Sequence, residues 1–251
     1  MTAIPYLAAA RFTGAECAPF LQAQLTADIL ALENGAATFA CYCTPKGQVL
    51  GLLRVERRDE GFLVAGDARL LPGILQRLKM YVLRTRVAFE AADDLAVVGL
   101  PGPDYAFAAI GEAADDVADP FWKAGELRAG IAWLGPDSSE KFIPQMLGFD
   151  AIGAVSFAKG CYPGQEIVAR ARYLGSVKRK PLIVEVAGPI EPAPGTKLRL
   201  QRGQEWHDAV VVDHAAADAD RTVVFTVARA EPDEPVRAIE FDGRTYGCAT
   251  M

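Results

Sequence analysis

The chain has 251 residues and a mass of 26.9 kDa, which suits one large domain or two to three compact ones. Hydrophobic residues make up 51% and charged residues 23%, a globular balance that excludes wholesale disorder. The net charge is −6, which excludes a surface that is basic all over, as nucleic-acid-binding proteins often have.

One segment departs from this acidic balance. Residues 159–180 hold six basic residues and a single acidic one, Glu166. The basic residues are Lys159, Arg170, Arg172, Lys178, Arg179 and Lys180. Such a segment in an acidic chain indicates either a contact with an anion or a solvated strip at a domain junction.

Composition also predicts the compartment. No run approaches the ~18–20 apolar residues of a membrane span, and the N-terminus lacks the basic head of a secretory leader. The five cysteines are odd in number and thinly spread, which does not suit a disulfide framework. We therefore expect a cytoplasmic protein without a membrane partner.

The sequence predicts no bound metal, because it has no CxxC and its only histidines are His207 and His214. Cys41 and Cys43 would share one face of a strand, and we expect them to be ordinary, largely buried thiols.

In chain order, apolar periodicity and turn residues predict helices over 17–32, 70–82 and 103–110, a hairpin over 47–66, and strands over 87–90 and 95–100. Asp137 and Glu140 resemble a capping box, which predicts a short helix within 137–150 that Pro144 limits. Six short β-rich runs follow Lys180 and predict a small antiparallel barrel or sandwich. The whole reads as α+β.

The loop over 159–164 is the most informative part of the sequence. Its glycines and proline do not suit a helix interior, so we expect a tight, exposed turn, followed by a helix or strand carrying Arg170 and Arg172. Lys159 is two residues from Cys161, and a nearby ammonium favours a thiolate. Cys161 is thus the best candidate for a reactive cysteine, and a purely structural loop is the alternative.

The segment KGCYPGQE (159–166) resembles the K-G-C-Y-x-G-Q-E signature of the YgfZ family, folate-binding relatives of the glycine-cleavage T-protein that support iron–sulfur proteins. Similar blocks extend over 20–29, 44–51, 77–87 and 142–180. The resemblance implies a T-protein-like fold, with two α+β portions around a central cavity and a C-terminal β-barrel. The implied domains are 1–180, with two intertwined subdomains, and 181–251.

The resemblance also implies a cofactor, tetrahydrofolate or another folate, and partners among iron–sulfur client proteins. A pocket for folate needs aromatic or aliphatic walls and cations for the glutamyl carboxylates. The candidates for this pocket are Tyr81, Arg84, Arg128, Tyr162 and Arg170. Tyr81 also fits a core position, and the two arginines Arg84 and Arg128 also fit a solvated surface.

The signature matches Lys159, Gly160, Cys161, Tyr162, Gly164, Gln165 and Glu166. Cys161, with Lys159, is the predicted catalytic or reactive group. Gln165 and Glu166 are expected to orient the loop by hydrogen bonds.

Three functions remain open on the sequence. The first is a folate-binding accessory factor for iron–sulfur enzymes, including those that modify tRNA. The second is a folate-dependent one-carbon transferase or demethylase. It is disfavoured because residues 69–76 contain no carboxylate where the T-protein has its acid. The third is a tRNA-binding module that uses the basic 159–180 segment through Lys178, Arg179 and Lys180.

Overall fold

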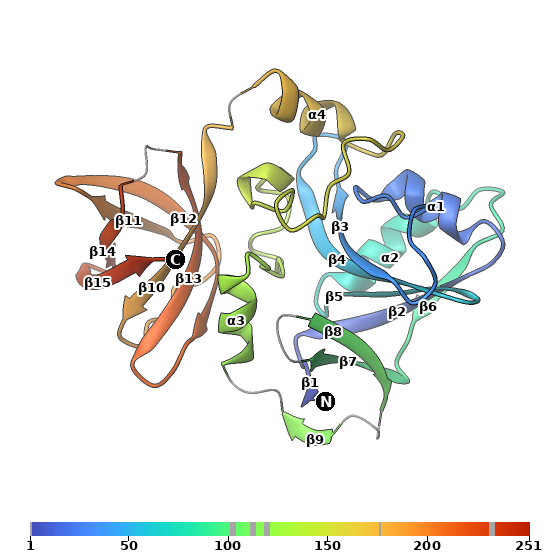
Figure 1. Cartoon of the computed structure of the whole chain (residues 1–251), viewed down its shortest axis with the longest axis horizontal. Coiled ribbons are helices and arrows are strands. Elements are labelled where there is room, and N and C mark those ends of the chain that lie inside the picture. The colour runs from blue at the N-terminus through green and yellow to red at the C-terminus, as the bar shows by residue number, and fades with distance from the viewer. Residues whose placement is uncertain (1, 101–103, 111–113, 118–120, 176, 231–233) are drawn as a thin grey trace.

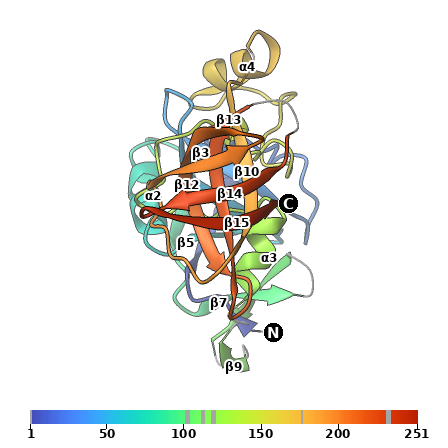
Figure 2. The same ribbon diagram turned by 90° about the vertical axis from the view of Figure 1, so that its left-hand side faces the viewer.

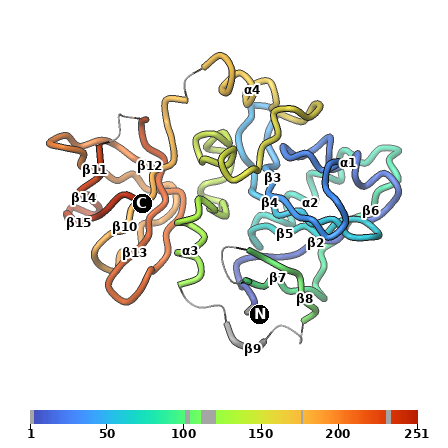
Figure 3. The backbone as a smooth tube through the Cα atoms, in the orientation of Figure 1, coloured from blue at the N-terminus to red at the C-terminus, as the bar shows by residue number. Residues whose placement is uncertain are grey.

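The computed structural model of the chain describes residues 2–100, 104–110, 114–117, 121–175, 177–230 and 234–251. It is a mixed α+β protein with two open sheets and a closed six-stranded barrel (Figure 1). Figure 3 shows that the backbone enters the barrel after helix α4 and stays there to the C-terminus. The predicted α+β class and barrel are confirmed.

The first sheet has five strands in the order β3-β4-β5-β2-β6. Their bounds are β2 Leu7–Thr13, β3 Ala37–Cys43, β4 Val49–Arg58, β5 Gly61–Asp67 and β6 Ala88–Ala91. The β4–β5 pair is the predicted hairpin. Both faces of this sheet are buried: along β3, Phe39, Cys41 and Cys43 join one core cluster, whereas Ala40 and Tyr42 join another. Strand alternation explains this division.

Helices α1 (Cys17–Gln24) and α2 (Leu71–Lys79) pack on one face of the sheet. The α2 helix confirms the prediction over 70–82. The helix predicted over 17–32 was too long, because it ends at Gln24. Beyond that point the Gln22 side chain accepts hydrogen bonds from the amides of Ile29 and Leu30, replacing the helical acceptors of those amides.

The second sheet has the order β8-β7-β1-β9. Its strands are β1 Thr2–Ala3, β7 Leu95–Leu100, β8 Asp104–Ala109 and β9 Ala114–Val117. The helix predicted over 103–110 was wrong for the described residues 104–110, and position 103 lies outside them. Alanines favour a helix locally, but β8 pairs with β7 in register from Leu95↔Ala109 to Leu100↔Asp104, and this pairing overrides propensity.

The short helix predicted within 137–150 was also wrong in form. Glu140 adopts a left-handed backbone with φ of 60°, and its amide donates to the carbonyl of Val49 at 2.8 Å. The segment is thus tied to strand β4, and only Pro144–Met146 forms a single 3₁₀ turn, η1.

Helix α3 (Trp122–Arg128) lies between the sheets and the barrel (Figure 1). Its Ala124 and Leu127 belong to the same buried cluster as Leu52 of the first sheet and as Val212 and Phe225 of the barrel. A continuous apolar core therefore joins all three parts.

The barrel closes in the order β10-β13-β12-β11-β14-β15 (Figure 2). Its strands are β10 Arg179–Ala187, β11 Lys197–Arg202, β12 Glu205–Ala216, β13 Arg221–Arg229, β14 Val236–Phe241 and β15 Arg244–Thr250. Strand β10 starts two residues before the predicted domain boundary at 181, directly after helix α4 (Gln165–Tyr173) and a short connection.

Candidate functional site

The signature loop, residues 159–166, leads into α4, which lies at the top of the view in Figure 1. Gly164 precedes α4 with φ of 83°, a backbone conformation that residues other than glycine rarely adopt. A Cβ on Gly164 would lie 2.5 Å from the carbonyl oxygen of Thr44 and 2.6 Å from the Cα of Gly47. Glycine is therefore required where this loop contacts the turn between β3 and β4.

Lys159 is buried, with 7% of its surface exposed. Its ammonium donates hydrogen bonds to the carbonyl oxygens of Gln22 and Leu25, at the C-terminal end of α1. It also lies 5.2 Å from the centroid of the Tyr162 ring. A cation at a helix C-terminus complements its unpaired carbonyls and its dipole, so Lys159 fastens the loop to α1. Burial lowers the pKa of Lys159 to about 8.

Cys161 is exposed, whereas its neighbour Tyr162 is buried against Val155 and Val168. The buried side chains of Lys159 and Tyr162 thus hold the backbone on both sides of an outward-facing thiol. The amide of Gln165 donates to the Tyr162 carbonyl at 3.1 Å as α4 begins. This arrangement can present the thiol to a large partner.

The other cysteines differ from Cys161 in exposure. Cys17, Cys41 and Cys43 are buried, and Cys248 is half-buried. Burial raises the pKa of the Cys17 and Cys43 thiols to about 12 and that of Cys248 to about 11. Cys41 and Cys43 share a face of β3, as expected of a CxC in a strand.

The predicted folate ligands lie at three separate places. Tyr81 and Arg84 are exposed after the end of α2. Arg128 ends α3 and pairs with Glu185 of β10 at 2.7 Å. Tyr162 and Arg170 belong to the signature loop and α4, where Tyr162 is buried and Arg170 is exposed. Their role in folate binding stays a prediction.

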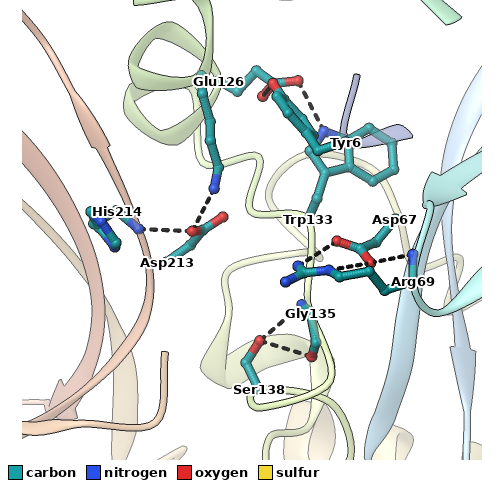
Figure 4. Close-up of polar contacts among 10 residues, drawn as sticks. Tyr6, Asp67, Arg69, Glu126, Trp133, Gly135, Ser138, Asp213 and His214 are labelled. Carbon is teal, nitrogen blue, oxygen red and sulfur yellow. Dashed lines mark hydrogen bonds and ion pairs between the residues drawn. The ribbon is translucent and has the colours of Figure 1, made fainter. Parts of the chain in front are cut away.

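The structure reveals a second group of polar residues, at the centre of the molecule, which we call the central polar cluster (Figure 4). Its members are Tyr6, Asp67, Arg69, Tyr105, Lys123, Glu126, Trp133 and Asp213. They come from both sheets, the connections before β2 and before α2, α3, the segment after α3, and barrel strand β12. The three parts of the fold therefore meet here.

Glu126 is the buried acid of this cluster, with 1% of its surface exposed. Its carboxylate accepts hydrogen bonds from the hydroxyl of Tyr6, from the hydroxyl of Tyr105 at 2.5 Å, and from the indole N–H of Trp133 at 2.9 Å. Burial raises the pKa of Glu126, while these three donors oppose the shift. Burying a carboxylate among aromatic rings costs free energy, and its hydrogen bonds only partly offset that cost.

Lys123 and Asp213 join α3 to the barrel. The Lys123 ammonium lies 2.6 Å from the Asp213 carboxylate and 5.5 Å from the centroid of the Tyr6 ring. Asp213 also accepts the amide of His214 at 2.8 Å, and burial lowers the pKa of the His214 imidazole.

Arg69 lies beside this pair, at the start of α2 (Figure 4). Its guanidinium binds the carboxylate of Asp67 at 2.8 Å and 3.2 Å. A Cβ on Gly135 would lie 2.4 Å from Arg69 Nη2, so the guanidinium lies directly against the Gly135 backbone. In the chain, Asp67 is the carboxylate that most closely precedes α2, and it is paired with Arg69.

Sequence reasoning missed the central polar cluster. Tyr6, Glu126 and Asp213 are far apart in the chain, and no local motif connects them. The one available signal was Glu126 itself, an acid within the apolar and aromatic stretch FWKAGELRAGIAWLG, residues 121–135.

No protein-family model matches the chain. An uncharacterized protein of Haemophilus influenzae is 32% identical over 222 aligned positions, covering 80% of this chain and 79% of the relative. The tRNA-modifying protein YgfZ of Yersinia enterocolitica is 30% identical over 258 positions, covering 84% and 78%. The chain belongs to the YgfZ family. YgfZ of Klebsiella pneumoniae is 29% identical and covers 91% of the chain and 84% of its own length.

A solved structure confirms the fold expected of a YgfZ-family protein. The glycine cleavage system aminomethyltransferase T of Bartonella henselae superimposes with a TM-score of 0.75 at 15% identity, covering 99% of this chain and 84% of its own. The fold is therefore T-protein-like. In the described part of the chain, no helix is long and apolar enough to cross a membrane, and no group of three or more metal-ligating side chains gathers.

Proposed function

We propose that this YgfZ-family protein binds tetrahydrofolate in the central polar cluster and supports the assembly or repair of iron–sulfur enzymes, including those that modify tRNA. The observation that carries the proposal is the buried Glu126 carboxylate among Tyr6, Tyr105 and Trp133, at the meeting point of the three parts of the fold.

The chemistry of the cluster suits a folate. The pterin ring offers adjacent N–H donors to a carboxylate and a flat face to aromatic rings, and Glu126 with its aromatic neighbours supplies both. Because the Glu126 carboxylate is buried and already bonded, the pterin donors would replace the hydroxyls of Tyr6 and Tyr105 on it. The glutamyl tail of folate carries carboxylates that need a cation. Arg69 lies at the same centre, and its side chain is 64% exposed although its guanidinium pairs with Asp67.

The iron–sulfur part of the proposal draws on the signature loop. Cys161 is exposed on the signature loop, which precedes α4, whereas the barrel follows α4 (Figure 1). Such a thiol is suited to an encounter with another protein, whereas a thiol serving the central cluster would face inward. Relatives named tRNA-modifying proteins are consistent with clients among tRNA-modifying enzymes.

Titration calorimetry with tetrahydrofolate under anaerobic conditions tests folate binding. We expect one saturable site, with affinity lowered about 10-fold or more in Glu126→Gln because the carboxylate acceptor is lost. Glu90→Gln, the same change on exposed strand β6, is the matched control and is expected to bind as the parent does. Absence of saturable binding at high micromolar tetrahydrofolate, or equal binding by both variants, contradicts the proposal.

A further inference from the structure

A basic hollow lies on the barrel and includes the segment that connects α4 to β10. Its volume is about 830 Å³. It is lined by Val177, Lys178, Arg179, Arg199, Trp206, His207, Asp208, Arg229 and Ala230, which we call the barrel groove. None of these residues belongs to the central polar cluster or the signature loop.

Positive charge dominates the groove. Lys178, Arg179, Arg199 and Arg229 line it, and Asp208 is the one acidic residue among its described lining. Lys178 and Arg179 are exposed and form no ion pair with an acidic side chain in the described part of the chain. These two side chains are thus available to an anionic ligand.

The strand register brings like charges together. In the β10–β13 ladder, Arg179 is directly opposite Arg229. The register therefore places two arginines at the same level of the groove.

The basic residues form a row across four strands. Arg199 is opposite Asp208 in the β11–β12 ladder, and Ala209 is opposite Ala228 in the β12–β13 ladder. Asp208 is therefore level with Arg229, and the row runs Arg179, Arg229, Asp208, Arg199. With neighbouring strands about 4.8 Å apart, this row spans roughly 14 Å. Asp208 separates Arg229 from Arg199 in this row, and Arg199 pairs with Glu240 of β14 at 3.2 Å. Among the described residues, the positive charge that faces no acidic partner is therefore that of Lys178 and Arg179, at the β10 end of the groove.

An aromatic ring stands at the end of this row. Trp206 is half-buried, and the Arg199 guanidinium lies 5.4 Å from the centroid of its ring. A single-stranded nucleic acid binds through cations that follow its phosphates and aromatic rings on which its bases stack. The groove has both the cations and the aromatic ring. An acidic protein segment would need the cations but not the ring, so the groove fits a nucleic acid better.

We propose that the barrel groove binds a short single-stranded segment of RNA, with phosphates at Lys178 and Arg179 and a base stacked at Trp206. The inference deepens the tRNA-modification part of the proposed function by giving the protein its own RNA contact. It also revises the contact surface expected from the sequence. Lys159 is buried against α1, whereas Lys178 and Arg179 combine with barrel residues that are distant in the chain.

Fluorescence anisotropy of a labelled single-stranded 12-nucleotide RNA, titrated with the full-length protein at several salt concentrations, tests the proposal. We expect saturable binding that weakens steeply with salt. Lys178→Glu/Arg179→Glu is expected to weaken binding at least 10-fold and to lower the salt slope by about one to two. Trp206→Ala is expected to lose about 5-fold or more through lost stacking, and Trp206→Phe to retain most of the affinity.

The matched control is Arg237→Glu/Arg244→Glu, which makes the same change of charge at exposed barrel positions outside the groove. It is expected to bind as the parent does. Equal losses in both double variants would show a general charge effect and overturn the proposal, as would an absence of saturable binding.

Two competitors separate other anions from RNA. Inorganic pyrophosphate that displaces RNA at equal concentration would make the groove a compact phosphate site, and poly-glutamate that does so would make it a site for an acidic protein segment. Either result overturns the proposal. Tetrahydrofolate titration of Lys178→Glu/Arg179→Glu distinguishes failure of the RNA proposal from failure of the folate proposal. A variant that binds tetrahydrofolate as the parent does but has lost RNA binding has lost the function of the groove alone.

Discussion

At the scale of single residues, Glu126 is held by three donors, so removal of one donor should be measurable. Tyr6→Phe deletes the hydroxyl that donates to Glu126 and leaves the ring in place. We expect the free energy of unfolding to fall by about 1–3 kcal/mol, because a buried carboxylate loses a hydrogen bond. Urea denaturation measures the change. Tyr173→Phe, which removes an exposed hydroxyl, is the control, and an equally small effect of both would contradict the importance of this contact.

The raised pKa of Glu126 also predicts a pH dependence. The Glu126 carboxyl has a pKa near 4.5 in the unfolded chain and a higher pKa in the folded protein. Between these two values the folded protein keeps a proton on Glu126 that the unfolded chain has released. The contribution of Glu126 to stability is therefore fully present below the unfolded pKa and is lost as pH rises through the folded pKa. The stability of the parent relative to Glu126→Gln should fall as pH increases over that window. Parallel unfolding curves of the two proteins at every pH would refute this.

Exposure distinguishes Cys161 from the other cysteines. An aromatic disulfide reagent added to the folded protein should release a rapid burst of one thiol equivalent, since the remaining thiols are buried or have raised pKa values. Cys161→Ser should abolish the burst, and Cys248→Ser should keep it. A burst that survives in Cys161→Ser would place the accessible thiol elsewhere.

At the scale of elements, Gly164 couples the signature loop to the β3–β4 turn. Gly164→Ala combines a left-handed backbone with a collision against Thr44 and Gly47, and we expect a loss of about 2–4 kcal/mol. Gly160→Ala is a matched control in the same loop, because a Cβ there meets nothing within 4 Å. Hydrogen exchange of the α4 amides and urea denaturation measure both. Equal protection of α4 in the two variants would be evidence against this coupling.

The elements that sequence predicted well are those whose pattern is local. The six barrel strands and α2 bury residues at the period of their own structure, so a short window suffices. The failures have distant partners. Residues 104–109 form a strand because β7 supplies the ladder. Beyond the end of α1 at Gln24, the Thr26 hydroxyl accepts the amide of Cys41 on β3. Neither partner is visible in the segment itself.

The candidate sites divide in the same way. Lys159, Cys161 and Tyr162 lie within four residues, so the sequence alone could identify their motif. It could not predict that Lys159 contacts the end of α1. The central polar cluster joins Tyr6 to Glu126 across 120 residues and Lys123 to Asp213 across 90. Only the assembled fold brings these side chains together.

At the scale of the whole molecule, the Lys123–Asp213 pair links α3 to the barrel within a shared apolar core. Because Asp213 is 6% exposed, removal of its cation leaves a poorly solvated charge. We expect Lys123→Met to lower the free energy of unfolding by about 2 kcal/mol. Asp213→Asn in the same background should add less than it does alone, giving a coupling energy of about 1 kcal/mol or more.

The exposed pair Arg11–Asp94, with a similar separation of 2.8 Å, provides the comparison cycle. Solvent screens that pair, so its coupling should be clearly smaller. If the two cycles gave equal coupling, the Lys123–Asp213 contact would be an ordinary surface pair, and α3 would hold the barrel through the apolar core alone. If the Lys123 cycle is larger, the same contact orders the central polar cluster and fixes the barrel. Under the proposed folate binding, tetrahydrofolate should then raise the melting temperature of the whole protein in one cooperative transition.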